Sequence, residues 1–487
     1  MANDVAAAQK GAAYLDRGNR LKREVDPYIP GLTRAQAAVA AGVPASQIVK
    51  LSSNENPIGP SPLALAAVRE QMAMIHEYPS PMADELRAAD ARTANSQTTR
   101  RSSETSCIFI FLEGGPSQLE TFDPKPNAID DVRGPYGTIA TNVPGIQIGE
   151  LLPMMAERMD RYALIRSLTG FTGGHTARPA LTGAVDSLTT YGAVVTKLKD
   201  HSGAMPPYVH LGGKIFNTPG IGGGVLGSAY DPVEILDPLG KQVQLPNFSL
   251  TADVSAGRFQ QRQELLTAID QLRAKAHSSL GVARLDTFYQ RAVNMLTSTK
   301  VRDAFDLSLE TETLRNRYGA NFFGQSLLMA RRLVEAGTRF VQVKWYDWDG
   351  AWDIHGYNST GVERMEEELC PRFDQGMTAL LDDLQQRGML DSTLIVAVGE
   401  MGRTPTINKW GGRDHWGACL FALLAGAGIP GGTVVGSSDA KAAYPANDPV
   451  SPAELAATLY RVLGININTD PRVRPFIGNA SPVAALV

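Results

Sequence analysis

The sequence predicts an α/β protein with a mostly parallel β-sheet between layers of helices. Residues 107–112 (CIFIFL) and 393–398 (TLIVAV) are apolar runs of buried-strand length, rich in β-branched and aromatic side chains. Twice, an amphipathic helical pattern comes just before such a run: residues 323–337 precede 339–346, and residues 373–389 precede 393–398. A helix followed by an apolar strand, repeated along the chain, is typical of a parallel sheet covered on both faces.

The first hundred residues differ from the rest of the chain. Residues 86–106 are polar and rich in Ser, Thr and Arg, which is typical of a solvated linker. We therefore expect an extra N-terminal segment, residues 1–100, followed by an α/β domain over residues 101–487.

Two further segments of that domain have distinct patterns. Residues 162–168 (YALIRSL) form another strand candidate. Residues 195–310 contain a Gly/Pro-rich piece followed by long helical patterns, and we expect this segment to be a cap-like insertion over the sheet.

Composition excludes several classes of protein. The 46 basic and 50 acidic residues nearly balance, giving a net charge of -4, so there is no electrostatic reason to expect nucleic acid as a partner. Cys107, Cys370 and Cys419 are too few and too scattered for a disulfide framework or a thiolate zinc site. No apolar run approaches the roughly eighteen residues of a membrane span. The first residues have no apolar signal region, so we expect a cytoplasmic protein.

Acidic and imidazole side chains follow several of the predicted strands. In open parallel sheets, ligands bind at the carboxyl ends of the strands, so we expect the side chains there to form one pocket. The candidates are Glu113 and Ser117 after the first strand; Asp347, Asp349, Asp353 and His355 after the third; Glu400 and Arg403 after the fourth; and Asp414 and His415 in a later loop.

Asp353 and His355 carry the strongest signal for a metal. They are two residues apart, so in an extended segment both side chains leave from one face. A carboxylate and an imidazole together suit zinc, whereas more carboxylates would favour magnesium or manganese, with calcium as a further alternative. Alternatively, Asp353 and His355 are polar residues of a solvated turn and bind no metal. Glu400 is alternatively a surface acid, or it forms an ion pair with Arg403.

The segment HTARPALTG begins at His175, after the strand candidate at 162–168. The hydroxyl of Thr176 at a helix start could attack a bound ester while helix N–H groups hold the anion. Arg178 or Arg403 could hold the anionic group, and Ser117 is a further candidate for contact with substrate. His175 is a candidate catalytic residue, as a general acid or base, or a metal ligand. Alternatively, Thr176 is only a helix N-cap and His175 only a loop histidine.

Several ordered stretches resemble one known family. FLEGGPSQLETFDPKP, ALIRSLTG, WDIHG, LLDDLQQRGMLDSTLIVAVGEMGRTP and GRDHWG are similar to the DUF1501 family, a sulfatase-like branch of the alkaline phosphatase superfamily, over about residues 105–470. The resemblance implies a mostly parallel sheet between helices, a metal site at the strand ends and a small anionic ester as substrate. It implies metal-ligand positions at Glu113, Asp353, His355, Glu400 and His415, and a nucleophile segment at HTARPALTG.

The sequence departs from the superfamily pattern in two places. The nucleophile loop has no Cys or Ser, and Glu400-Met401-Gly402 stands where Asp-His-Gly is usual. We therefore expect one metal ion, or an altered pair, in a hydrolase of phosphate or sulfate esters. The alternative is a non-catalytic scaffold that binds an anionic ligand or a partner protein. Members of the DUF1501 family are often exported, so the resemblance implies export as an alternative to the cytoplasm.

The N-terminal segment resembles a different family. YIPG, VKLSSNENPIGPSP and HEYPSP, within residues 24–82, look like the start of histidinol-phosphate aminotransferase. The match stops before the lysine that would bind pyridoxal phosphate, so we expect no pyridoxal phosphate. A transaminase is therefore the least favoured function, and we interpret the segment as a fused remnant.

Overall fold

The computed structural model describes residues 105–199, 203–214, 221–237, 298–345, 351–357, 360–465 and 474–487. All of them belong to the unit Arg92–Val487. The N-terminal segment 1–100, most of the expected cap-like insertion, and the candidates Asp347 and Asp349 lie outside the described residues.

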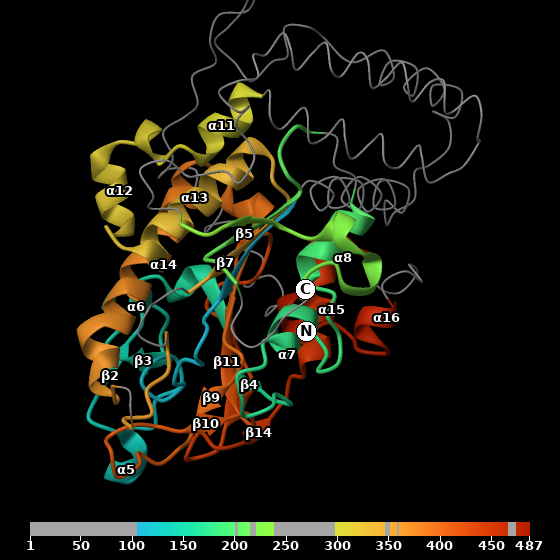
Figure 1. Ribbon diagram of the computed structural model, residues 1–487. Coiled ribbons are helices and arrows are strands. Elements are labelled where there is room, and N and C mark those ends of the chain that lie inside the picture. The colour runs from blue at the N-terminus through green and yellow to red at the C-terminus, as the bar shows by residue number, and fades with distance from the viewer. Residues whose placement is uncertain are drawn as a thin grey trace, which may run out of the picture. The chain divides into compact units, whose positions relative to one another are not determined.

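A central sheet of eight strands organises the described residues (Figure 1). Its spatial order is β12-β4-β11-β8-β1-β7-β5-β6. Neighbouring strands are parallel except where β11 pairs antiparallel with β4 and β8, so the predicted mostly parallel α/β fold is confirmed. The strands are β1 (Ser106–Phe111), β4 (Tyr162–Leu168), β5 (Tyr208–Leu211), β6 (Val233–Ile235), β7 (Phe340–Lys344), β8 (Thr393–Val398), β11 (Leu420–Ala425) and β12 (Val434–Val435).

Strand β1 shows why its sequence is a continuous apolar run. Successive side chains point to opposite faces, so Ile108 and Ile110 pack into one hydrophobic core while Phe109 and Phe111 pack into the other. All six residues of the strand are buried. Burial of each large apolar side chain contributes about 1.5–3 kcal/mol, so both faces of β1 stabilise the fold.

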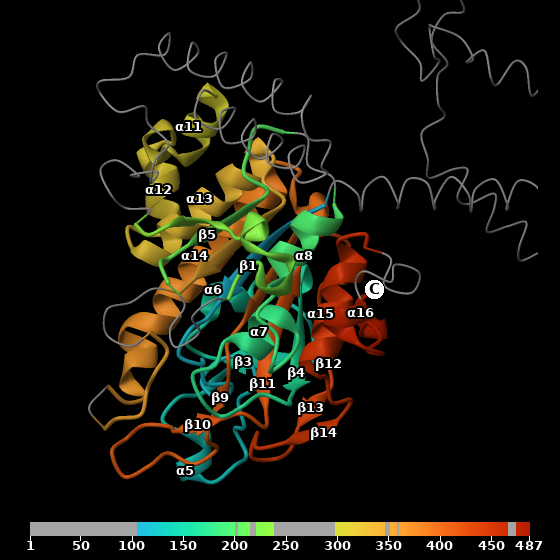
Figure 2. The ribbon, with the colours of Figure 1, turned by 45° about the vertical axis from the view of Figure 1, so that its right-hand side comes forward.

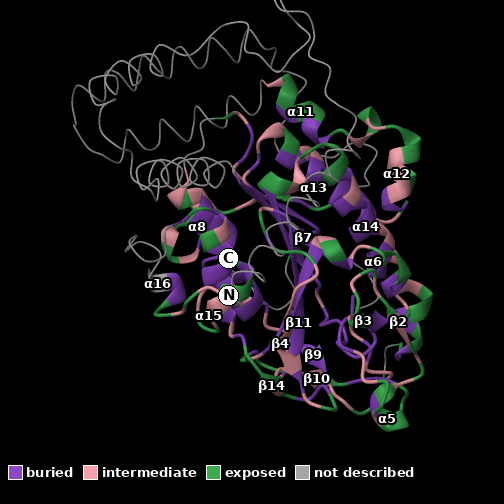
Figure 3. Cartoon of the chain, turned by 180° about the vertical axis from the view of Figure 1, so that it is seen from behind, coloured by how far each residue is buried: buried purple, intermediate pink, exposed green. Residues whose placement is uncertain are grey.

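Helices cover both faces of the sheet, as Figures 1 and 2 show. One core contains side chains of α6 (Pro153–Ala156), α11 (Thr299–Phe305), α12 (Glu312–Tyr318), α13 (Phe322–Ala336) and α14 (Cys370–Gln386). The other contains side chains of α7 (Arg178–Thr182), α8 (Tyr191–Leu198), α15 (Pro452–Val462) and α16 (Arg474–Ile477). Seen from behind, the buried residues concentrate in the sheet and on the inner helix faces (Figure 3).

The helices that precede β7 and β8 begin and end for local reasons. Helix α13 is capped by the Asn321 side chain, which accepts a hydrogen bond from Gly324 N, and it ends at Gly337 in the left-handed conformation. Helix α14 continues from a π-helical turn, Met365–Leu369, and buries one face against α13. The predicted helix–strand repeats are therefore confirmed at both places.

Part of the expected cap-like insertion belongs to the sheet instead. Strands β5 and β6 lie within residues 195–310, and β5 pairs with β7 in parallel register. The expectation of a cap is wrong for these strands, because β5 (YVHL) extends the sheet beyond β7 and β6 forms its edge. Residues 238–297 are outside the described ranges.

Small two-stranded sheets lie beyond the central sheet. Strand β9 (Gly402–Arg403) pairs antiparallel with β10 (His415–Trp416), and both lie near β11 (Figure 1). Strands β2 (Thr138–Ala140) and β3 (Gln147–Gly149) form a second pair, and β13 (Ser437–Ser438) and β14 (Pro445–Asn447) a third. The short helix α5 (Asp130–Arg133) lies near β10. Within the described part of the chain, no helix has the length and apolar character needed to cross a membrane.

Candidate metal centre

The topology brings four separate segments to one edge of the sheet. Strands β4, β7 and β8 run in the same direction, so the loops that follow them leave from the same edge. His175 follows β4, Asp353 follows β7, and Glu400 lies two residues after β8. His415 is in β10, which leads into the antiparallel strand β11, and an antiparallel strand starts where its parallel neighbours end. This common edge explains why residues distant in sequence meet.

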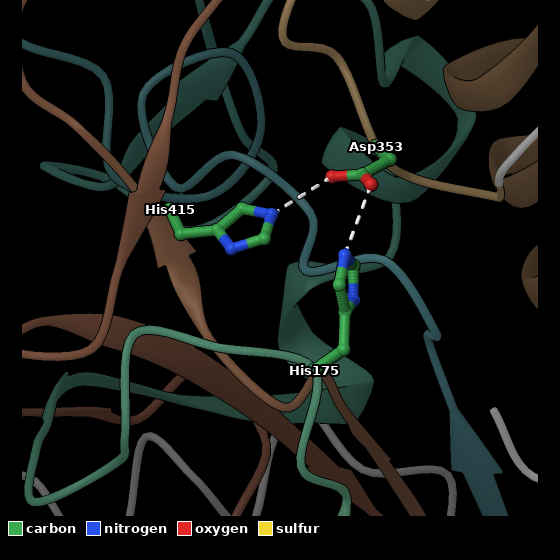
Figure 4. Close-up of side chains that lie close together, drawn as sticks. All are labelled: His175, Asp353 and His415. Carbon is green, nitrogen blue, oxygen red and sulfur yellow. Dashed lines mark hydrogen bonds and ion pairs between the residues drawn. The ribbon is translucent and has the colours of Figure 1, made fainter. Parts of the chain in front are cut away.

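Three imidazoles surround the carboxylate of Asp353. The Nε2 atom of His175 lies 3.1 Å from Oδ2, and the Nε2 atom of His415 lies 3.2 Å from Oδ1. The Nδ1 atom of His355 also lies 3.2 Å from Oδ1. Figure 4 shows the His175 and His415 rings directed at the two oxygens of Asp353 from different segments. Each ring is partly exposed, so solvent reaches the cluster.

Glu400 holds the far side of the His175 ring. Its Oε1 atom lies 3.1 Å from Nδ1 of His175 and accepts a hydrogen bond of 2.9 Å from the backbone N–H of Gly114. The carboxylate is almost fully buried and needs these partners, because an unpaired buried charge is costly. Gly114 has φ +100, and a Cβ there would lie 2.5 Å from Trp352 N, so this close approach requires glycine.

Arg403 fixes Asp353 from inside the protein. Its fully buried guanidinium donates to Oδ1 of Asp353, to the carbonyl oxygens of Gly114 and Trp352, and, at 2.8 Å, to that of Gly115. One side chain therefore ties the loops after β1, β7 and β8 together. Asp353 keeps Oδ2 directed at His175 while Oδ1 is held by the arginine.

Electrostatics in the metal-free cluster favour an ionised Asp353. Burial raises the pKa of Asp353, but hydrogen bonds from His175 and His415 and the charge of Arg403 outweigh it and hold the pKa well below its usual range. Burial lowers the pKa of His175, yet its bonds with Asp353 and Glu400 raise that pKa to about 9. Burial and the nearby charge of Arg403 lower the pKa of His355 despite Asp353.

The donor set fits a divalent cation. One ligand atom from each of His175, Asp353 and His415 lies within 4.8 Å of the other two. Two imidazole nitrogens and a carboxylate oxygen are ordinary zinc ligands, and ligands about 2.0–2.2 Å from one ion lie about 3–3.5 Å apart. The distance from His175 Nε2 to Oδ2 of Asp353, 3.1 Å, and the distance from His415 Nε2 to Oδ1, 3.2 Å, are in that range, so each carboxylate oxygen faces one of these two imidazoles. Metal ligands are usually held in place by hydrogen bonds to a second layer of residues, and here Glu400 holds His175 while Arg403 holds Asp353.

The structure places three of the predicted site residues outside this cluster. Glu113 forms an ion pair of 2.7 Å with Lys344, the last residue of β7. Asp414 is exposed, and its carboxylate accepts a hydrogen bond from Asn408. Ser117 is fully buried, and its hydroxyl has no hydrogen-bond partner among the described residues. Glu113 and Asp414 are therefore not among the clustered ligand atoms, and Ser117 has no exposed surface to present to a substrate.

Arg403 and Thr176 also have surroundings that differ from those expected. Arg403 has no exposed surface with which to hold a substrate anion, and its acidic partner is Asp353 rather than Glu400. Thr176 is half-buried and does not cap α7, because the capping residue is Ala177 and no side chain caps that helix. Arg178 is the first residue of α7 and is half-buried.

Sequence reasoning placed His175 in the catalytic group and missed its direct contact with two acidic residues. The position of His175 after the strand β4 could have predicted this contact, because β4 ends at the same edge of the sheet as β8, which Glu400 follows. It also missed two exposed aromatic residues beside the cluster, Tyr357 and Trp410. Their exposure is a property of the folded loops and has no signature in the local sequence.

Comparison with known proteins separates the two parts of the chain. Near the N-terminus, 59 residues are 48% identical to histidinol-phosphate aminotransferase of Methanopyrus kandleri, which is 12% of this chain and 15% of that relative. A stretch of 65 residues is 51% identical to the same enzyme of an Anaeromyxobacter species, covering 13% of this chain and 17% of the relative. The chain thus spans less than a fifth of either relative's length.

Among solved structures, the fold is similar to a sulfatase and a phosphonate monoester hydrolase. The sulfatase PsFucS1 from Pseudoalteromonas sp. is 13% identical with a TM-score of 0.34, over 83% of this chain and 75% of that chain. The phosphonate monoester hydrolase from Silicibacter pomeroyi is 11% identical with a TM-score of 0.35, over 78% of each chain.

A family model covers most of the chain. The model is described as "Protein of unknown function (DUF1501)", and it matches residues 104–472. The match runs from the residues just before β1 to beyond α15, and so includes every residue of the candidate metal centre. The chain belongs to the DUF1501 family.

Proposed function

We propose that this protein is a metal-dependent hydrolase of small phosphate or sulfate esters. The observation that carries the proposal is the convergence of His175, Asp353 and His415, with ligand atoms within 4.8 Å of one another at the strand edge where ligands bind in such sheets. The ordered motifs that resemble the alkaline phosphatase superfamily point to the same class of reaction.

His175, Asp353 and His415 would hold the ion. A bound divalent metal would polarise the ester oxygen and lower the pKa of a water molecule. Glu400 accepts from Nδ1 of His175, which leaves Nε2 of the neutral ring as a ligand atom. Zinc suits this set of two imidazoles and one carboxylate better than magnesium, manganese or calcium, which prefer oxygen ligands.

His355 fits a role in proton transfer better than a role as metal ligand. Its Nδ1 atom faces Oδ1 of Asp353, which already accepts from Arg403 and lies 3.2 Å from His415. Because the pKa of His355 is lowered, its ring is neutral at pH 7. If Nδ1–H donates to Asp353, the Nε2 atom, which has no hydrogen-bond partner among the described residues, can accept a proton. Thr176, directly after His175, is the hydroxyl available for attack on the ester, and Arg178 is available to the anion.

The test is to measure bound metal and turnover together. Purified protein is analysed for bound metal ions and assayed with aryl phosphate and aryl sulfate esters, before and after chelation. We expect a bound divalent ion and metal-dependent turnover, both lost in Asp353→Asn and His415→Ala and both retained in Asp391→Asn, a control at an exposed acid outside the cluster. No bound metal and no metal-stimulated turnover would remove the proposal.

A second candidate is a non-catalytic scaffold that binds an anionic ligand or a partner. The burial of Ser117 favours it, because this serine, in the loop after β1, is inaccessible to a substrate. Binding of inorganic phosphate or sulfate that persists unchanged in His355→Ala, without turnover in the unaltered protein, would select this alternative. We do not propose a transaminase, because the matched segment covers 15% of that enzyme.

A further inference from the structure

Two of the three exposed aromatic side chains in the described ranges stand beside the candidate metal centre. Tyr357 is 60% exposed and Trp410 is 49% exposed, and their ring centroids lie 5.0 Å apart. The third, Tyr444, packs edge-on against Trp416. Exposed large aromatic rings lose the benefit of burial, so two in contact at the margin of a candidate site suggest a binding surface.

The aromatic pair is attached directly to the backbone that carries His355. Tyr357 follows His355 by two residues, a span of at most about 7 Å between the Cα atoms. Asn408 donates from Nδ2 to the carbonyl oxygen of His355 at 2.9 Å, and its Oδ1 accepts from Trp410 N at 3.0 Å. Gly356 has φ +76, and a Cβ there would lie 2.3 Å from the Trp410 carbonyl oxygen, so the two loops touch.

The chemistry of the pair is complementary to a ring. Tyrosine and tryptophan present flat apolar faces that pack against aromatic rings or the C–H face of a sugar. The ammonium of Lys409 lies 4.3 Å from the centre of the Trp410 ring. Such a contact is weak at an exposed site, so this positive charge can turn toward an anionic ester.

We propose that Tyr357 and Trp410 bind the alcohol portion of the substrate, and that this portion carries a ring with a flat apolar face, as a sugar or an aryl group does. The inference deepens the proposed function and rests on it, because the anionic group of the same ester would lie at His175, Asp353 and His415. A simple alkyl ester would leave the two rings uncovered.

The test uses esters that share an anionic group and differ in the ring. Methyl phosphate, phenyl phosphate and glucose 6-phosphate are compared with the three corresponding sulfates. Trp410→Ala and Tyr357→Ala are the test variants, and Tyr444→Ala is the matched control. Tyr444 is equally exposed, but it packs on Trp416, whose side chain leaves β10 on the face opposite His415.

We expect each test variant to raise KM for the ring-bearing esters about three- to tenfold, with kcat unchanged and methyl ester kinetics unchanged. Trp410→Phe should restore most of the affinity. A KM effect confined to phenyl esters identifies an aryl substrate, and one confined to glucose esters identifies a sugar substrate. No KM effect on either ring, or an equal effect on the methyl ester, overturns the inference.

The inference and the proposed function can fail separately. If the unaltered protein turns over none of the esters, the hydrolase proposal fails, and equilibrium binding of phenyl phosphate and glucose 6-phosphate is measured against inorganic phosphate. Tighter binding of a ring compound than of inorganic phosphate, lost in Trp410→Ala but kept in Tyr444→Ala, supports the aromatic surface. Equal binding of all three compounds refutes it.

Discussion

The buried guanidinium of Arg403 donates to Oδ1 of Asp353, 50 residues earlier in the chain. The contact leaves the other carboxylate oxygen facing His175. Because the same guanidinium also binds the carbonyl oxygens of Gly114 and Gly115, the position of Asp353 is set by the loops after β1 and β8 as well as by its own. Arg403 is therefore a positioning residue for the candidate metal centre.

Replacing Arg403 by methionine should destabilise the protein strongly. The change removes the buried donor that Arg403 supplies to several carbonyl oxygens and to Oδ1 of Asp353. Removal of one partner of a buried pair costs about 3–5 kcal/mol. The free energy of unfolding from urea titration measures the loss. The control is Arg302→Met, at an exposed position of α11, which should change that free energy by less than about 0.5 kcal/mol. Similar values for the two variants would contradict the role assigned to Arg403.

The stability of the metal-free protein should fall as the pH rises toward 9. The pKa of His175 is about 9 in the folded chain, above its ordinary 6.5, so its contribution is complete below pH 6.5 and is lost as the pH rises through 9. His355, with a lowered pKa, acts in the opposite sense and costs stability below pH 6.5. Urea unfolding in the presence of chelator, from pH 5 to 10, measures both effects.

The His175→Gln variant should lack the loss of stability above pH 6.5, and His355→Gln should lack the loss below it. A His175→Gln profile that still falls between pH 6.5 and 9 as in the unaltered protein would show that another group titrates there. Since a metal binds neutral imidazole, loading at pH 7 should also release a proton from His175.

The fold could be predicted from the sequence where a single segment shows by its own pattern which element it forms. The runs that became β1, β4, β7 and β8 are long and apolar, and amphipathic helices precede two of them, so local pattern and tertiary role agree. Strand β11 was missed although LFALLA is as apolar, because no helical pattern marks its place and its antiparallel direction depends on its neighbours. Strands β5 and β6 are too short to stand out from a loop.

For the candidate site, the sequence could predict only which side chains follow the carboxyl ends of strands and therefore lie at the same edge of the sheet. The common edge predicts that His175, Asp353 and Glu400 approach one another, and the structure places them together. The same rule fails for Glu113, because β1 and β7 pair with Phe111 opposite Lys344, and that register brings a lysine to the acid. Which residues form ion pairs across a sheet depends on the register between neighbouring strands, and this register could not be predicted from the sequence alone.

Zinc binding should stabilise the protein by an amount that grows with the logarithm of the ratio of free zinc to its dissociation constant. A free ion at 100 times its dissociation constant adds about 2.7 kcal/mol to the free energy of unfolding. We expect thermal unfolding to shift upward on zinc addition in the unaltered protein and in Asp414→Asn, whose carboxylate faces Asn408. His415→Ala, one residue away, should lose the shift. Equal loss in both variants would mean that Asp414 takes part in the site after all.

The buried pair of Glu120 and Arg413 should control how firmly His415 is held. Arg413 is fully buried two residues before His415, and its Nη2 atom donates to Oε1 of Glu120 at 2.6 Å and to the carbonyl oxygen of Val132 at 2.9 Å. Glu120→Ala leaves the arginine charge buried without its acid, so we expect a loss of about 3–5 kcal/mol in the free energy of unfolding. Because the loop before β10 then loses its anchor, the affinity for zinc should fall as well.

Glu367→Ala is the matched control, since Glu367 is exposed and a loss there should stay within about 0.5 kcal/mol. Glu120→Gln separates charge from shape, because the amide keeps one acceptor oxygen for Arg413 but no negative charge. If zinc affinity falls in Glu120→Ala and recovers in Glu120→Gln, the hydrogen bond positions His415. If affinity is unchanged in Glu120→Ala while stability drops, the loop is held by its other contacts, such as the bond from Arg413 N to the Ile354 carbonyl oxygen.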